Sequence, residues 1–231
     1  MSQEAGTKAS RGDRRREAIL TAATEVFLEK GFDGATLDEI IRRAGGSRAT
    51  LYAQFGDKQG LFAAIISALC ERMLAPLHDP DEERRRLSST LLAFGRRYLD
   101  VLMAPESIAL YRVIIAASLH TPSLGARVFE AGPEPAANRL SAYFRREAEG
   151  GKLTIGDPDR AARIFLEMVK GDLHTRALFG AGAPPMAEEI DRSVRAAVEI
   201  FCRGAEAGNA RPTRLDRAAP GGGAAPGSPR G

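Results

Sequence analysis

Apolar residues recur every three or four positions along most of this 231-residue chain, and this spacing limits the possible folds more than any other feature. Ile19, Ala23, Val26 and Phe27 show the pattern near the N-terminus. Long alternation of apolar and polar residues, which is typical of half-buried β-strands, does not occur. The sequence therefore predicts an all-α protein.

Clusters of glycine and proline divide this pattern into about nine expected helices. The expected ranges are 13–30, 37–44, 48–54, 58–75, 82–103, 106–118, 122–149, 157–179 and 186–206. We expect a break near residues 131–135, where Gly132 to Pro135 interrupt the seventh range. The expected architecture is an N-terminal three-helix helix-turn-helix domain followed by a larger helical domain.

The two ends of the chain differ in composition from the middle. Basic groups at both ends supply the net charge of +3, and residues 208–231 consist mainly of glycine, proline and alanine. Such segments bury too little apolar area to offset the entropy lost on ordering. We therefore expect a disordered basic arm over 1–12, a helix-turn-helix domain over 13–60, a helical domain over 61–207 and a disordered tail over 208–231.

Residues 36–62 contain the most informative motif. Thr36 followed by Glu39 has the spacing of a capping box, which predicts a helix start. Gly45 and Gly46 favour a tight turn, and Ser47 can cap a second short helix. Two short helices joined by such a turn form a helix-turn-helix. A seven-residue helix is about 10 Å long and fits a major groove about 12 Å wide.

The polar side chains of the second helix suit contact with DNA. Arg48 and Thr50 begin this helix, where helix-turn-helix proteins contact base edges. Tyr52, Gln54 and Lys58 can donate hydrogen bonds to phosphate oxygens. The motif therefore predicts a partner of double-stranded DNA.

Alternatives remain open for several of these groups. Tyr52 could instead be a core aromatic residue, and Arg42 and Arg43 could form a solvated helix face. The basic run 14–16 is either a charged helix start or a contact with the DNA backbone. Cations are unfavourable at a helix N-terminus, which supports the second possibility.

The segment AGGSRATLYAQFGDKQGLF resembles the DNA-binding domain of TetR-family transcriptional regulators. The matching positions are Ala44, Gly45, Ser47, Thr50, Leu51, Tyr52, Phe55, Lys58 and Leu61. Gly46 stands where this family usually has valine, Ala49 where glycine is common, and Gln54 where histidine is frequent. The resemblance covers about residues 14–62.

This resemblance implies roles for individual residues. Arg48 and Ala49 are expected to face bases, and Thr50 a base or a phosphate. The expected contacts to the DNA backbone and the helix cap come from Thr36, Ser47, Tyr52, Gln54 and Lys58.

The second half of the chain is similar to the AefR-like C-terminal domain of some TetR-type repressors. The similarity rests on positions such as Pro122, Gly132-Pro133 and Asp157-Pro158. It implies effector binding and dimerisation. Candidate pocket residues are Phe94, Tyr98, Met103, Tyr111, His120, Phe144, Met168 and His174, each of which could instead be plain core or surface.

The last two expected helices are apolar enough to pack on two sides. They are expected to form a two-fold dimer interface through Phe165, Val169, Val194, Val198 and Phe201, with a purely monomeric core as the alternative.

These observations predict a cytoplasmic, homodimeric transcriptional repressor that binds a palindromic operator and is released by a small-molecule effector. The alternatives are an architectural DNA binder without an inducer and an α-helical enzyme that binds a small molecule. Neither a cofactor nor a metal is expected, because the three histidines lie far apart and catalytic motifs are missing. We expect no contact with a membrane, because apolar runs fall short of the ~20 residues that span a bilayer.

Overall fold

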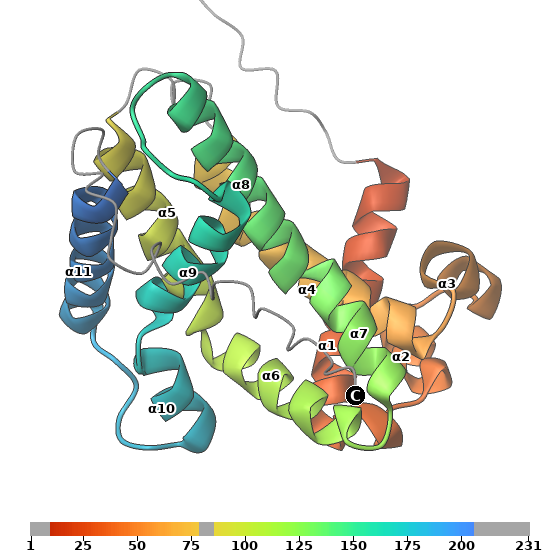
Figure 1. Cartoon of the computed structure of the whole chain (residues 1–231). Coiled ribbons are helices and arrows are strands. Elements are labelled where there is room, and N and C mark those ends of the chain that lie inside the picture. Colours follow the sequence, from red (N-terminus) through yellow and green to blue (C-terminus); the bar gives the residue numbers. More distant parts are fainter. Residues whose placement is uncertain (1–9, 79–85, 206–231) are drawn as a thin grey trace, which may run out of the picture.

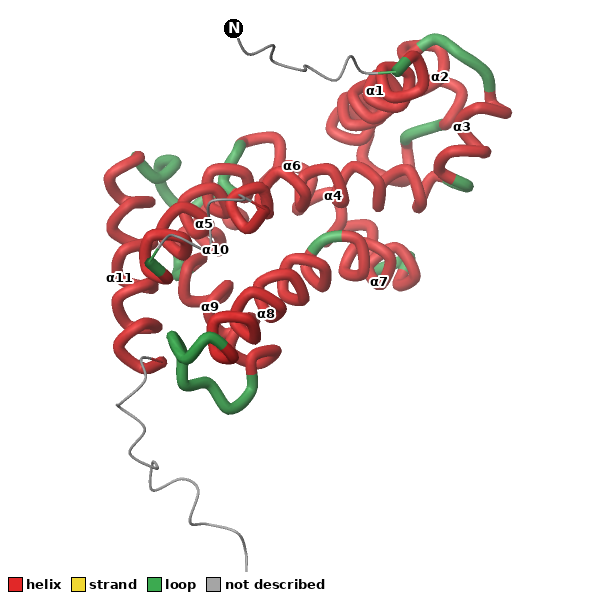
Figure 2. The backbone as a smooth tube through the Cα atoms, turned by 90° about the horizontal axis from the view of Figure 1, so that it is seen from above, coloured by secondary structure: helices red, strands yellow, loops and turns green. Residues whose placement is uncertain are grey.

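The computed structural model describes residues 10–78 and 86–205 (Figure 1). Within these ranges the chain forms eleven α-helices and one 3-10 turn, without a strand (Figure 2). The first part comprises α1 (Arg11–Gly34), α2 (Leu37–Ala44), α3 (Arg48–Phe55), α4 (Lys58–Leu74) and the turn η1 (Ala75–His78). The second comprises α5 (Leu87–Leu102), α6 (Pro105–Ser118), α7 (Pro122–Ala131), α8 (Pro133–Glu149), α9 (Pro158–Lys170), α10 (Leu173–Phe179) and α11 (Ala187–Ala205). The all-α prediction is confirmed.

Local sequence signals explain where many helices begin. The side chains of Thr36, Ser47 and Asp57 accept hydrogen bonds from backbone N–H groups three residues further on. Proline occupies the first position of α6, α7, α8 and α9, where its missing N–H costs nothing. These caps explain why most helix starts were predictable to within a few residues.

The structure corrects several expected boundaries. Helix α1 begins at Arg11, because Ser10 and Asp13 form a capping box, so residues 10–12 are not part of a disordered arm. The expected helix over 157–179 is wrong, because Gly171 has φ +49° and separates α9 from α10. The expected break near 131–135 is confirmed at Gly132. The other expected disordered residues, 1–9 and 208–231, lie outside the described residues, as does the expected start of the helix at 82.

Two aromatic clusters form the centres of the core. Phe27 and Phe32 of α1 contact Phe62 of α4, with ring centroids 5.0 and 5.9 Å from that of Phe62. The second cluster joins α5, α8, α9 and α11, and its members are Phe94, Phe144, Phe165 and Phe201. Helices α3 and α11 lie at opposite ends of the molecule (Figures 1 and 2).

Helix α4 connects the two parts of the molecule. It packs against α1 on one side and against α5, α7 and α8 on the other. By length and composition the 20 residues Lys58–Leu77 could cross a bilayer, which corrects the expectation that every apolar run is shorter. Leu61, Phe62 and Leu74 are almost completely buried within this chain, as in a core helix.

Candidate DNA-binding surface and effector cavity

Helix α3 has one buried and one exposed face. Leu51 and Phe55 point into the core, whereas Arg48, Tyr52 and Gln54 are exposed. Because half of the Tyr52 surface (51%) is open to water, the alternative of a core aromatic residue is wrong. The exposed face therefore presents a guanidinium, a phenol and an amide.

Arg48 is held by a carboxylate of the preceding helix. Its Nε donates to Oδ1 of Asp38 over 2.6 Å, and its Nη2 donates to the other oxygen of the same carboxylate. This pairing raises the pKa of Arg48. At the start of α3, the hydroxyls of Ser47 and Thr50 lie 3.0 Å apart. Asp38 was missed from sequence, since nothing in the motif marks a partner ten residues before the arginine.

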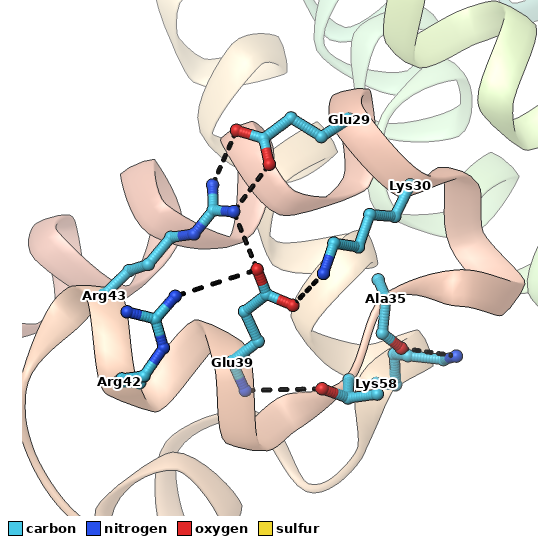
Figure 3. Close-up of polar contacts among 8 residues, drawn as sticks. Glu29, Lys30, Ala35, Glu39, Arg42, Arg43 and Lys58 are labelled. Atoms are coloured by element: carbon cyan, nitrogen blue, oxygen red, sulfur yellow. Dashed lines mark hydrogen bonds and ion pairs between the residues drawn. The ribbon is translucent and has the colours of Figure 1, made fainter.

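Lys58 has three backbone partners that the sequence did not predict. Its Nζ donates to the carbonyls of Phe32 (2.8 Å), Ala35 (3.1 Å) and Asp33 (3.3 Å), and it lies 4.6 Å from the centre of the Phe32 ring. An ammonium has three donors, and all three have backbone acceptors here. Lys58 therefore joins α4 to the end of α1 and to Ala35, which precedes α2 (Figure 3), and the expected phosphate contact stays a prediction.

An ion network holds α1 against α2 beside this lysine (Figure 3). The Glu39 carboxylate accepts hydrogen bonds from Lys30 and, over 2.7 Å, from Arg43, and these donors lower its pKa. Arg43 also donates to both oxygens of Glu29 over 2.7 and 2.5 Å. Only half of the expected capping box is present: Thr36 accepts from the Glu39 N–H, but the carboxylate turns to the cations instead.

Arginines of α1 lie beside the turn that precedes α3. The Arg16 guanidinium lies 5.0 Å from the centre of the Phe55 ring. The Arg15 guanidinium covers Gly46, and a Cβ placed there would lie 2.1 Å from one of its nitrogens. Gly46 also has φ +122°, which L side chains rarely adopt. The basic run 14–16 is therefore within a helix and next to the recognition motif.

The remaining expected DNA contacts lie on α3 or at the start of α2. Thr36, Ser47 and Ala49 are exposed, and Thr50 is half-buried. Arg42 is largely exposed (73%) with Glu39 3.9 Å away, so its side chain faces solvent, whereas Arg43 is tied into the ion network. The expected contacts are thus exposed at this end of the molecule, apart from Thr50 and Lys58, which are half-buried.

A cavity of about 230 Å³ lies in the larger helical part, and it is lined by residues of α4, α5, α6, α7, α8 and α9. Its walls are mostly apolar, with Leu69, Met73, Leu102 and Leu166 among them. Cys70 also lines it, and its thiol donates to the carbonyl of Gly132 over 3.3 Å. Burial raises the pKa of Cys70 to about 11, so the thiol stays protonated near neutral pH.

Only two expected pocket residues, Tyr98 and Tyr111, line this cavity. His174 is buried behind Tyr111, 4.8 Å between ring centroids, and burial lowers its pKa to about 4. Phe94 and Phe144 belong to the aromatic core. The structure places the last three candidates away from the cavity walls: His120 is exposed, and Met103 and Met168 are half-buried.

Sequence reasoning missed several polar residues of the cavity. Ser107 lines it from α6, and Arg163, Glu167 and Lys170 line it from α9. Residues 163, 167 and 170 recur at helical spacing on one face, but the sequence alone does not indicate that this face meets a cavity.

Two family models match the chain. Residues 19–65 match the model of the tetR family of bacterial regulatory proteins, and residues 89–204, half of the chain, match the AefR-like transcriptional repressor C-terminal domain. The chain belongs to the TetR family. The expected family is therefore confirmed for both domains of this TetR-family protein.

Three relatives illustrate the range of the match. The solved structure named "Flavonoid-responsive Regulator FrrA" is 33% identical and has a TM-score of 0.67. The match covers 84% of this chain and 97% of the FrrA chain. The transcriptional activator FasR of Mycolicibacterium smegmatis is 35% identical over 36% of this chain and 39% of its own length. The transcriptional repressor NicS of Pseudomonas putida is 29% identical over 46% of this chain and 55% of its own length. This TetR-family chain thus matches less than two thirds of either curated relative.

The expected dimer residues of this TetR-family chain are buried within one subunit. Phe165, Val169, Val194, Val198 and Phe201 are at most 9% exposed and pack in the core. They cannot also face a partner, so the structure corrects the residues assigned to the interface. The outer faces of the same helices carry Ile164 (49% exposed) and Ile200 (63% exposed) instead.

Proposed function

We propose that this TetR-family protein is a homodimeric transcriptional repressor that places α3 of each subunit in the major groove of a palindromic operator and is released by a small molecule. The exposed polar face of α3 carries this proposal. Arg48, Tyr52 and Gln54 form a donor-rich surface on an eight-residue helix, which is a suitable length for a major groove. A DNA-binding role also implies a cytoplasmic location, where the operator is found.

Helix α4 supplies a physical link between effector and DNA. Its first turn is tied to the helix-turn-helix domain by Lys58 and to α7 by Asp57, which accepts a 2.6 Å hydrogen bond from Arg127. Further along the same helix, Ile66 and Cys70 line the cavity. An effector that favours another position of α4 would shift the population toward dimers whose two recognition helices no longer match the operator spacing.

The contacts of α4 with both parts of the molecule support a division into domains at 13–60 and 61–207, with α4 crossing the boundary. Lys58 and Phe62 contact the helix-turn-helix part, whereas Ile66 and Cys70 further along α4 line the cavity of the larger part. The first turns of α4 therefore belong with both domains.

The dimer would form through the exposed faces of α9 and α11. Ile164 of α9 and Ile200 of α11 are exposed, and α11 lies at the end of the molecule opposite α3 (Figure 1). A two-fold axis beside α11 would bring two copies of this apolar area together. The variant Ile200→Glu should shift the protein from dimer to monomer in light scattering. Leu119→Glu, at an exposed leucine next to α6, is the matched control and should remain dimeric.

The main test is a gel-shift assay with the intergenic DNA upstream of the gene. The full-length dimer should shift one palindromic fragment in preference to random DNA. The double variant Arg48→Ala/Tyr52→Ala should lose this preference, whereas Arg86→Ala, at the exposed residue before α5, should retain it. Failure of a folded dimer to shift any palindromic fragment at low salt would refute the proposal.

The relatives support a role in transcriptional regulation, but their names include both an activator and a repressor. FasR is named as an activator and NicS as a repressor, and FrrA is named for its response to flavonoids. A repressor predicts that deletion of the gene raises transcription from the bound promoter, and an activator predicts the opposite. The relatives are regulators and not enzymes, so an enzymatic function is not proposed for the cavity.

A further inference from the structure

We propose that the cavity binds an uncharged, mostly apolar molecule that carries a hydrogen-bonding oxygen, such as a phenol or a ketone. This inference rests on the proposed function, in which the cavity receives the effector. It depends on three features of the cavity: an unpartnered buried hydroxyl, two neutral tyrosines and a charged edge without a dedicated counter-ion for a ligand.

The first feature is Ser107. Its side chain lines the cavity from α6, the residue is only 1% exposed, and its Oγ has no hydrogen-bond partner among the described residues. Buried hydroxyls normally have a partner, since an unsatisfied one loses its bonds to water without compensation. A ligand oxygen bound beside Ser107 would supply the missing partner.

The second feature is the neutral character of the interior. Tyr98 and Tyr111 line the cavity, and burial is the main cause that raises the pKa of each phenol. Both therefore remain protonated and can donate to an oxygen of the ligand. The thiol of Cys70 is also protonated and already donates to the Gly132 carbonyl. The interior thus offers neutral donors between apolar walls.

The third feature is the charge arrangement on α9. Glu167 and Lys170 pair over 2.7 Å, and the exposed Arg163 lies one turn before Glu167. The negative charge of Glu167 also raises the pKa of both tyrosines, so it acts on the space that they line. Glu167 neutralises Lys170, and Arg163 is exposed to water, so a buried carboxylate would lose its hydration without gaining a buried cation, and an ammonium would meet Lys170. An uncharged ligand avoids these costs of desolvation.

A set of naphthalene derivatives with the same ring body tests the ligand class. The full-length protein is titrated by calorimetry at pH 7 with 2-naphthol, 2-naphthoate, 2-naphthylmethylammonium and 2-methylnaphthalene. We expect 2-naphthol to bind at least tenfold more tightly than either ion and more tightly than 2-methylnaphthalene. Equal or tighter binding of either ion, or no binding of 2-naphthol to folded protein, would overturn the proposal.

Two variants test whether the oxygen is bound where the structure indicates. Ser107→Ala and Tyr111→Phe should each weaken 2-naphthol binding by up to about tenfold and leave 2-methylnaphthalene unchanged. Ser107→Ala removes no existing hydrogen bond, so the unliganded protein should melt at an unchanged or higher temperature. Ser118→Ala, on the same helix but outside the cavity, should affect neither ligand. An equal loss for both ligands, or no loss in either variant, would contradict the predicted hydrogen bond.

A parallel gel shift separates this inference from the proposed function. Binding of 2-naphthol by a protein that shifts no palindromic DNA would refute the regulator while supporting the ligand class. Specific operator binding by a protein that prefers 2-naphthoate would refute the ligand class alone.

Discussion

The helix-turn-helix domain and the larger helical domain use their polar groups in opposite ways. In the first, polar groups form an exposed network, in which Lys30, Glu39 and Arg43 join α1 to α2 and Asp38 holds Arg48. In the second, Ser107 and Tyr98 lie inside the protein around a cavity. This arrangement supports the proposed roles, with DNA at the surface of one domain and a small molecule inside the other.

The two domains share helix α4. It contributes Lys58 to the contacts with the end of α1 and Cys70 to the cavity. The proposed communication between a cavity ligand and the recognition helix can therefore pass through α4 and also through α6, which lines the cavity and packs against α1.

The largest effect is expected from Phe62→Ala, because this ring is fully buried between α1 and α4. We expect a loss of about 3–5 kcal/mol in the free energy of unfolding. Hydrogen exchange should show that protection falls mainly in α1–α3. In Phe144→Ala, which opens the second aromatic cluster, protection should instead fall in α8–α11.

The exposed Leu119→Ala should change neither stability nor exchange, and it serves as the control. Equal loss of protection across the whole chain in both phenylalanine variants would show that the two domains form one cooperative unit.

Lys58→Met should produce the next effect, since three carbonyls lose their charged donor. We expect a loss of about 3 kcal/mol in unfolding free energy, measured by urea denaturation. Lys30→Met removes only an exposed ion pair and should cost at most about 1 kcal/mol. The salt dependence of DNA binding distinguishes the two roles of Lys58: a phosphate contact would reduce the slope of log K against log salt by about 0.9, whereas a structural lysine leaves it unchanged.

Arg48→Ala tests base contact by the recognition helix. We expect a loss of about 1–3 kcal/mol in binding to the operator and little change for random DNA, measured by titrating labelled fragments. Tyr52→Phe should weaken binding to all sequences alike, if its hydroxyl contacts phosphate. A uniform loss in Arg48→Ala would contradict its role in sequence preference.

The smallest effect is expected in the pH dependence of the ion network. Lys30, followed by Arg43, lowers the pKa of Glu39 in the folded protein. A carboxylate with a lowered pKa stabilises the fold above its usual pKa, and this contribution is lost as pH falls through the folded value. Glu39→Gln should therefore be less stable than the wild type at pH 7, and the difference should shrink in acid.

Urea midpoints measured from neutral to acid pH give this comparison, with the exposed Glu17→Gln on α1 as the control. A difference between wild type and Glu39→Gln that stays constant across the range would show that the ion network does not stabilise the domain.

The sequence predicted the helix-turn-helix domain in more detail than the rest. Its signals are local: Thr36 and Ser47 cap their helices, and Gly45 ends the helix between them. The partners of its side chains were not predictable, because Lys58 contacts residues more than twenty positions away. Spacing identifies the position of a side chain in a motif but does not determine which atom it contacts.

In the larger domain, the sequence predicted the helices but not the side chains that lie in the interior. Helical periodicity predicted its helices, apart from Gly171, which falls within an otherwise continuous pattern. Periodicity does not distinguish the face that meets a neighbour from the face that meets solvent. The expected dimer residues Val194 and Val198 were therefore assigned to the wrong surface, and Ser107 was missed in the cavity.

The contact between Arg15 and Gly46 also limits how this protein can change over generations. The usual family valine at position 46 would collide with the Arg15 guanidinium and would require a different backbone conformation. Replacement of Arg15 would clear the space, but a valine at φ +122° would still be strained. Position 46 can therefore lose its glycine only together with a change in the backbone of the turn between α2 and α3.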